Sequence, residues 1–237
     1  MKIVKTIKIR TTTEAKTMNK ETRYLEFDIR AEKTEERGSV ITGQPIVFNQ
    51  ETDLGLCRET IDAGALDKTD LRDVRFLVGH DFSMVPLARS RNNNEHSTMQ
   101  LMVNEEGMGI RVNLDTENNP RAKELYSAIS RGDISGMSFA FTVDKDSWEG
   151  LDTESPLRHI CSINRVFEVS AVAFPAYEGT SIQAASEGDA LESVKASLES
   201  ARKQAEEERA EEARMERRRA VLERLENLTK EVKRNEV

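Results

Sequence analysis

The chain has 237 residues, of which 37% are hydrophobic and 33% charged, and its formal net charge is −8. Average globular domains are about 45–50% apolar and about 25% charged, so we expect an ordinary domain diluted by a charged appendage. The negative charge argues against nucleic acid as the main partner, and no apolar stretch approaches the roughly 20 residues of a membrane span.

Residues 1–22 form a basic N-terminal extension without the apolar segment of a secretory signal. We interpret it as a solvated extension or as a short arm that docks on an acidic surface. The two cysteines, Cys57 and Cys161, are too few for a disulfide framework, which favours a reducing compartment.

Short apolar runs alternate with turn residues between positions 23 and 185, which is typical of antiparallel strands. Strands are predicted at 24–29, 40–48, 74–78, 96–103, 109–114, 136–143 and 167–174. The residues from Asn104 to Gly107 suit a hairpin loop of four or five residues. We therefore predict a mainly β, α+β fold: a closed or nearly closed antiparallel barrel, or a sandwich, with peripheral helices.

One helix is predicted inside this region. Asn119 can cap its start, Pro120 suits the first helical position and Gly132 suits its end. A second short helix is predicted over residues 62–71.

Residues 186–237 are predicted to form a long charged helix. Apolar residues recur at heptad-like spacing, but charged residues interrupt the seam at Glu208, Glu212 and Arg219. Such a helix cannot build a core alone, so it self-associates, docks on a partner or stays solvated.

Three segments carry residues suited to chemistry. In the 136–143 strand, alternation places Phe139 and Phe141 on one face and Ser138 on the other, among small residues that leave room for a substrate backbone. His80 follows Gly79 at a strand end, where a side chain can project into a cleft. Each residue alone also fits a purely structural role.

Glu168 interrupts an otherwise apolar strand. A buried carboxylate is costly unless it is paired or hydrogen-bonded, so Glu168 demands a partner. That partner is either a basic residue in a structural ion pair or the Nδ1–H of a catalytic histidine.

Other chemistries lack their ligands. The chain has no zinc-type Cys/His spacing, no phosphate-binding or dinucleotide motif and no G-x-S-x-G elbow, so neither a metal nor a cofactor is expected. His96 lies in a polar run and is expected to be exposed. A Cys161 nucleophile beside His159 is the weaker alternative.

The segments VITGQPIVFN, RETIDAGAL, VRFLVGHD, RGDISGMSFAF and FEVSAVAFPAYEGTSI occur in this order between Tyr24 and Ser181. In order and spacing they resemble the HK97-type prohead (procapsid maturation) serine proteases of tailed bacteriophages. The family often has Gly before the arginine that aligns with Arg89, whereas this chain has Ala88, which leaves any role for Arg89 open.

The resemblance implies a fold similar to the herpesvirus assemblins, a β-barrel with surrounding helices. It implies His80 as the general base, Ser138 as the nucleophile and Glu168 as the third member, with His159 as the alternative for that place. The enzyme would act inside the immature procapsid in the host cytoplasm, on the major capsid protein, on scaffold or delta-type segments and on itself.

Two further interpretations stay open. The chain could be a non-enzymatic capsid assembly or scaffolding protein with an inert site, or a fused protease and scaffold. The C-terminal helix could mediate self-association or co-assembly with helical capsid elements, and self-cleavage could remove it.

Overall fold

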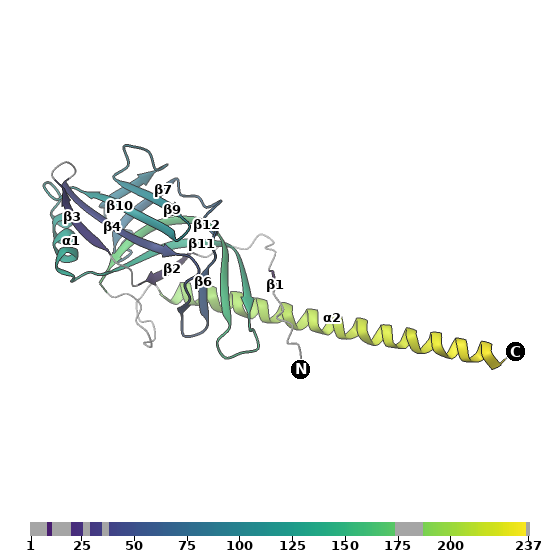
Figure 1. Ribbon diagram of the computed structural model, residues 1–237. Helices are drawn as coiled ribbons and strands as arrows, with labels where there is room; N and C mark the ends of the chain where they lie inside the picture. The colour runs from purple at the N-terminus through teal and green to yellow at the C-terminus, as the bar shows by residue number, and fades with distance from the viewer. Residues whose placement is uncertain (1–8, 11–19, 26–28, 35–37, 174–186, 236–237) are drawn as a thin grey trace. The chain divides into compact units, whose positions relative to one another are not determined.

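The computed structural model describes residues 9–10, 20–25, 29–34, 38–173 and 187–235 (Figure 1). The chain forms two compact units, Met1–Lys195 and Ala196–Val237. Among the described residues the secondary structure is mainly β, with two α-helices, and the second of these is long. This confirms the mainly β class and the long C-terminal helix.

The larger sheet is centred on two long strands, β11 (Gly136–Glu149) and β12 (Leu157–Val172), which pair antiparallel. On one side, β11 also pairs with β1 (Ile9–Arg10) and β2 (Lys20–Leu25). On the other side, β12 pairs in parallel with β6 (Arg58–Ile61) and β7 (Asp73–Val78). The sheet ends in β5 (Thr52–Asp53), next to β6, and β8 (Ala88–Arg91), next to β7.

The smaller sheet is antiparallel, in the order β3 (Arg30–Thr34), β4 (Gly38–Val47), β10 (Gly107–Leu114) and β9 (Met99–Asn104). The two sheets share one hydrophobic core, which includes Ile41 and Ile46 of β4 and Phe139 and Phe141 of β11. Neither sheet closes on itself within the described strands, so a closed barrel is not confirmed and the assemblin-like fold stays a prediction.

Helix α1 (Pro120–Arg131) confirms the helix predicted between Asn119 and Gly132. The Asn119 side chain accepts hydrogen bonds from the amides of Arg121 and Ala122, and Gly132 ends the helix at φ 78°. Buried Ala122, Leu125 and Ile129 join the core, so α1 anchors the turn that leads into β11 (Figure 1).

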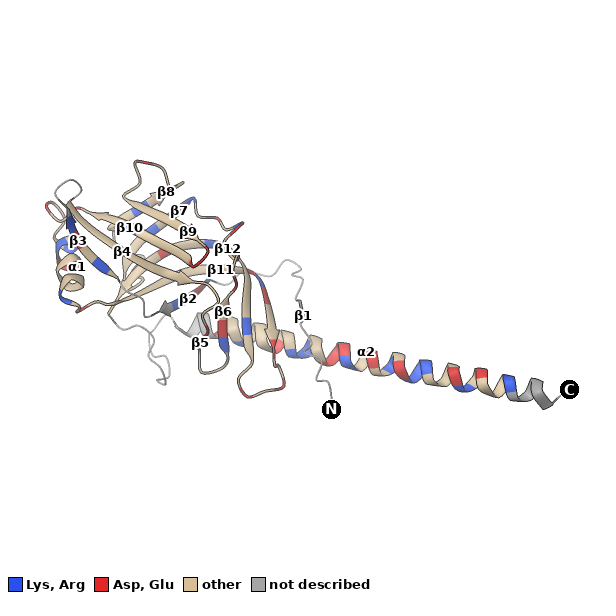
Figure 2. Cartoon of the chain, viewed as in Figure 1, with Lys and Arg blue, Asp and Glu red and all other residues tan. Residues whose placement is uncertain are grey.

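Helix α2 (Glu187–Asn235) carries acidic and basic residues along its length (Figure 2). Its side chains from Glu206 to Lys230 are all exposed, including five large apolar ones. These are Met215, Val221, Leu222, Leu225 and Leu228. No helix among the described residues is long and apolar enough to cross a membrane.

Several sequence-based predictions differ from the structure. The predicted helix over 62–71 is absent: residues 63–68 form consecutive turns and Asp70 forms an isolated bridge with Arg165. Gly64 adopts a φ of 83°, and the amides of Ala65 and Asp67 bond to carbonyls three residues back. Strand β2 crosses the predicted boundary at residue 22. The rest of the N-terminal extension except β1, and the segment 174–186 with its PAYEGTSI sequence, lie outside the described residues.

The β9–β10 hairpin is tighter than predicted, because Asn104 and Gly107 pair directly and leave a loop of Glu105 and Glu106. Gly107 adopts a φ of 147° and packs its Cα against β4. A Cβ at this position would lie 2.0 Å from the carbonyl oxygen of Ile46. Only glycine fits there without displacing the backbone of β4.

We predict that Gly107→Ala lowers the free energy of unfolding by more than about 3 kcal/mol, since backbone atoms must separate to admit the methyl group. Gly109→Ala is the matched control in the same strand, because its nearest new contact is the flexible Met102 side chain at 3.5 Å. Its expected cost is below about 1 kcal/mol. Urea denaturation measures both, and equal costs would contradict this account.

Candidate active site

The pairing of β11 with β12 brings the Ser138 and Glu168 segments together. In this register Ser138 lies opposite Ser170 and Ala140 lies opposite Glu168. Because side chains alternate along a strand, these four residues share one face, while Phe139 and Phe141 belong to the core. The predicted alternation is therefore confirmed, but Ser138 and Ala140 are fully buried rather than open to a substrate.

His80 reaches this face from the end of β7, which pairs with β12 at Glu168–Ala171. Gly79 and His80 both adopt a φ of 59°, a left-handed conformation that is costly for histidine. Two hydrogen bonds, each donated by a backbone amide to a residue of β12, hold this turn. The amide of Gly79 donates to the Ala171 carbonyl at 3.0 Å, and the amide of His80 donates to Ser170 Oγ at 3.1 Å.

The imidazole of His80 lies between Ser138 and Glu168. Its Nε2 is 2.6 Å from Ser138 Oγ, and its Nδ1 is 2.7 Å from Glu168 Oε1. The His80 side chain is 6% exposed and that of Glu168 is 0% exposed. Of the two partners considered for Glu168, the structure has the histidine.

This arrangement suits proton transfer. A carboxylate only accepts hydrogen bonds, so the contact with Glu168 requires a proton on Nδ1. In the neutral ring, Nε2 is then the acceptor and faces the Ser138 hydroxyl. Hydroxyl, imidazole and carboxylate in this sequence can generate a serine nucleophile.

The family model described as caudovirus prohead serine protease matches residues 25–195. The chain belongs to this family. The match confirms the resemblance noted from the sequence and covers Ser138, His80 and Glu168. No curated protein and no solved structure matched the chain.

The residues considered as alternatives lie in other surroundings. His159 Nδ1 is 2.9 Å from Asp62 Oδ1, and His159 pairs in register with Ser147 rather than with the Ser138 end of β11. His96 is exposed, as expected. Burial raises the pKa of the Cys161 thiol, which disfavours the thiolate that a cysteine nucleophile needs.

The structure also shows the partner of Arg89 and the surroundings of possible metal ligands. The Arg89 guanidinium forms a bidentate pair with Asp73 on the neighbouring strand, at 2.6 and 2.9 Å, which gives it a structural partner. Among the described residues, no three His, Cys, Asp or Glu side chains form a group that could hold a metal ion.

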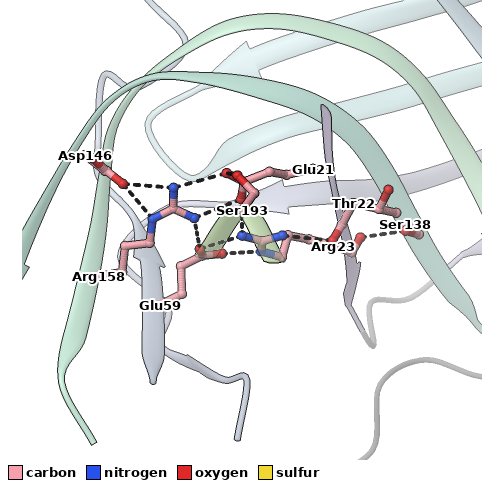
Figure 3. Close-up of polar contacts among 8 residues, drawn as sticks. All are labelled: Glu21, Thr22, Arg23, Glu59, Ser138, Asp146, Arg158 and Ser193. Atoms are coloured by element: carbon pink, nitrogen blue, oxygen red, sulfur yellow. Dashed lines mark hydrogen bonds and ion pairs between the residues drawn. The ribbon is translucent and has the colours of Figure 1, made fainter. Parts of the chain in front are cut away.

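Sequence reasoning missed a buried ion network beside the site (Figure 3). Arg23 donates to Glu21 and Glu59, and Arg158 donates to Glu21, Glu59 and Asp146. Ser193, at the start of α2, adds a hydrogen bond to Glu21 at 3.1 Å. The network joins β2, β6, β11, β12 and α2, and no local sequence pattern signals it.

The same network fixes the strand that touches Ser138. Ser138 Oγ lies 2.6 Å from the backbone carbonyl oxygen of Arg23, whose side chain is held by the two glutamates (Figure 3). A buried charge pair of this kind costs desolvation energy, which only good geometry and several hydrogen bonds offset. The position of Arg23 beside Ser138 is therefore strongly determined.

Electrostatics support this account. Burial alone would raise the pKa of Glu21, but Arg23 and Arg158 outweigh it and lower the pKa from 4.5 to about 2. A carboxyl whose pKa is depressed on folding stabilises the protein above its unfolded pKa. That stabilisation is lost as the pH falls from about 4.5 towards about 2.

We predict that Glu21→Gln lowers the free energy of unfolding near pH 7 by about 3 kcal/mol, because two buried guanidinium groups lose a charged partner. The variant should also lose the part of the acid sensitivity that Glu21 supplies below about pH 4.5. Urea denaturation across this pH range measures both effects. Glu105→Gln, in the exposed hairpin loop, is the control and should stay within about 0.5 kcal/mol; the same result for Glu21→Gln would refute the network's role.

Proposed function

We propose that this chain is a serine endopeptidase of phage prohead maturation, with Ser138 as nucleophile, His80 as general base and Glu168 as third member. The observation that carries the proposal is the pair of contacts on one imidazole, 2.6 Å to Ser138 and 2.7 Å to Glu168. The family match adds the reaction class, because the family is one of serine proteases.

In this mechanism Ser138 Oγ attacks the carbonyl carbon of the scissile peptide while His80 Nε2 takes the hydroxyl proton. Glu168 keeps Nδ1 protonated and stabilises the imidazolium that forms. His80 then donates its proton to the leaving amine, and an acyl-serine remains. A water molecule, deprotonated by the same imidazole, hydrolyses the ester and restores the hydroxyl.

The proposed substrates are the scaffold or delta-type segments and the extensions of the major capsid protein, together with this chain itself. Their cleavage would take place inside the immature procapsid, where a prohead protease acts. The non-enzymatic scaffold is the alternative. A scaffold has no need for a buried carboxylate aligned on an imidazole that in turn faces a hydroxyl, so the site favours the protease.

The first test of this proposal needs no known cleavage site. Purified full-length chain is followed by mass spectrometry for self-trimming and treated with a fluorophosphonate, which labels activated serine hydroxyls. We expect wild type to be trimmed and labelled, and Ser138→Ala and His80→Ala to show neither. Identical behaviour of wild type and Ser138→Ala, alone and with procapsids present, would favour the scaffold.

A second prediction separates the two candidates for the third member. Glu168→Gln should slow labelling by about 10³- to 10⁴-fold, since an amide no longer holds the productive tautomer. His159→Ala should label at nearly the wild-type rate, because His159 pairs with Asp62. The opposite ranking would assign the third position to His159.

We also propose that α2 recruits the protease by packing against helical, charged scaffold segments. Exposed apolar side chains recur on its charged C-terminal half at spacings of three, four and seven residues, as in helix pairs. These include Val221, Leu225 and Leu228. Self-association through the same residues is the alternative.

Truncation tests the role of α2. A stop after Ala205 keeps Ser193, which bonds to Glu21, and removes the fully exposed part of the helix. We expect self-trimming to persist and the amount of protease co-purifying with procapsids to fall at least about fivefold, equivalent to about 1 kcal/mol. Leu225→Glu in the full chain should have the same effect. Unchanged packaging of both variants would refute recruitment by α2.

A further inference from the structure

A second serine lies directly opposite the nucleophile. Ser170 of β12 pairs in register with Ser138 of β11 and is fully buried. Its hydroxyl contacts two residues of the site at once: it donates to Glu168 Oε2 at 2.6 Å and accepts from the backbone amide of His80 at 3.1 Å.

We propose that Ser170 is a positioning residue that holds the general base and the third member in their working geometry. The inference rests on the proposed function, because it gives Ser170 a role only through His80 and Glu168. In this role Ser170 acts through these two residues and not on the reacting atoms.

The direction of both hydrogen bonds is determined by chemistry. A carboxylate can only accept and a backbone amide can only donate, so the single proton of Ser170 must point to Glu168. The hydroxyl therefore has one arrangement, whichever ring nitrogen of His80 carries a proton. Because its hydrogen bonds allow only one orientation, the Ser170 hydroxyl can hold both neighbouring residues in fixed positions.

Ser170 first restrains the carboxylate. The two oxygens of Glu168 receive different donors: Oε1 faces His80 Nδ1, and Oε2 receives the Ser170 hydroxyl. Rotation of the carboxylate would break both bonds in a fully buried site. Ser170 thus keeps Oε1 directed at the imidazole and satisfies a charge that would otherwise be unpaired on one side.

Ser170 also restrains the base through its backbone. His80 is held at a φ of 59°, a left-handed conformation that is unfavourable for a residue with a Cβ. Such a conformation persists only where the surroundings determine it. The bond from the His80 amide to Ser170 is one of the two that fasten this turn to β12, the other being that of Gly79.

Burial alone does not explain these contacts. Ser90 of β8 is equally buried, and its hydroxyl has no hydrogen-bond partner among the described residues. A buried serine is thus accepted in this sheet without partners, whereas Ser170 has two, both in the candidate active site. Ser90 provides a matched control.

The test measures the rate of fluorophosphonate labelling of the full-length chain as a function of pH. In this reaction Ser138 Oγ bonds to phosphorus, fluoride leaves and the hydroxyl proton passes to His80. We expect Ser170→Ala to lower the rate about 10- to 100-fold, as loss of an outer partner of a catalytic group commonly does. The acidic midpoint of the profile should move to higher pH, because a less solvated carboxylate holds the imidazolium proton more strongly.

Three comparisons make the result specific. Ser170→Thr retains the hydroxyl and should recover most of the rate and the wild-type midpoint. Ser90→Ala should change neither. In a Glu168→Gln background, Ser170→Ala should slow labelling much less than in wild type, since it acts largely through Glu168.

A wild-type rate and midpoint for Ser170→Ala would overturn the proposal. So would a lower rate that follows the loss of folded protein in a thermal melt, with the midpoint unmoved and no rescue by threonine. Failure of the wild-type chain itself to label or self-trim would instead refute the protease function, so the two ideas fail by different observations.

Discussion

The antiparallel pairing of β11 with β12 is the constraint on which the site depends. Its register sets Ser138 opposite Ser170 and Ala140 opposite Glu168, and the parallel pairing of β7 with the same stretch of β12 delivers His80. A shift of one residue in either pairing would turn the alternating side chains to the other face and separate the hydroxyl, imidazole and carboxylate. The site is therefore a property of strand register as much as of residue identity.

The buried charged side chains near these strands are stabilised in two ways. In the network of Glu21, Arg23, Glu59 and Arg158, each charge faces opposite charges, and the cost of desolvation is offset by many hydrogen bonds. Glu168 instead has a histidine and a serine as its hydrogen-bond donors. Lys20 is a nearby charge, but no guanidinium bonds to this carboxylate among the described contacts, so it can still stabilise a positive charge that appears on the imidazole. This contrast separates the supporting network from the candidate active site.

Much of this arrangement could be predicted from the sequence, for specific reasons. The alternation of bulky and small residues around Ser138 predicted the face of the strand on which it lies. Gly79 indicated the strand end at which His80 lies, and the single carboxylate of Glu168 in an apolar strand indicated that it has a hydrogen-bond partner. The capping pattern of Asn119 and Gly132 located α1.

The rest depends on contacts between distant strands. In the sequence, Glu21 and Arg23 belong to a polar N-terminal region. Only the fold shows their partners, because β6 and β12 place Glu59 and Arg158 beside them. Ser170 is one small residue among several in β12, and only the pairing with β11 and β7 reveals what its hydroxyl contacts. The helix predicted over residues 62–71 was wrong. The composition of this segment suits a helix, but Gly64 and the hydrogen bonds to β12 produce turns.

The carbonyl of Arg23 has a consequence for the timing of any reaction at Ser138. The Ser138 hydroxyl has a single proton but two possible acceptors, the Arg23 carbonyl oxygen and His80 Nε2, each 2.6 Å from Oγ. In the proposed mechanism, the hydroxyl donates to the Arg23 carbonyl while Nε2 carries a proton, and it can donate to Nε2 only when that nitrogen carries none. The strand that borders Ser138 thus supplies a second acceptor for its hydroxyl proton, and the ion pairs of Arg23 hold that acceptor in place.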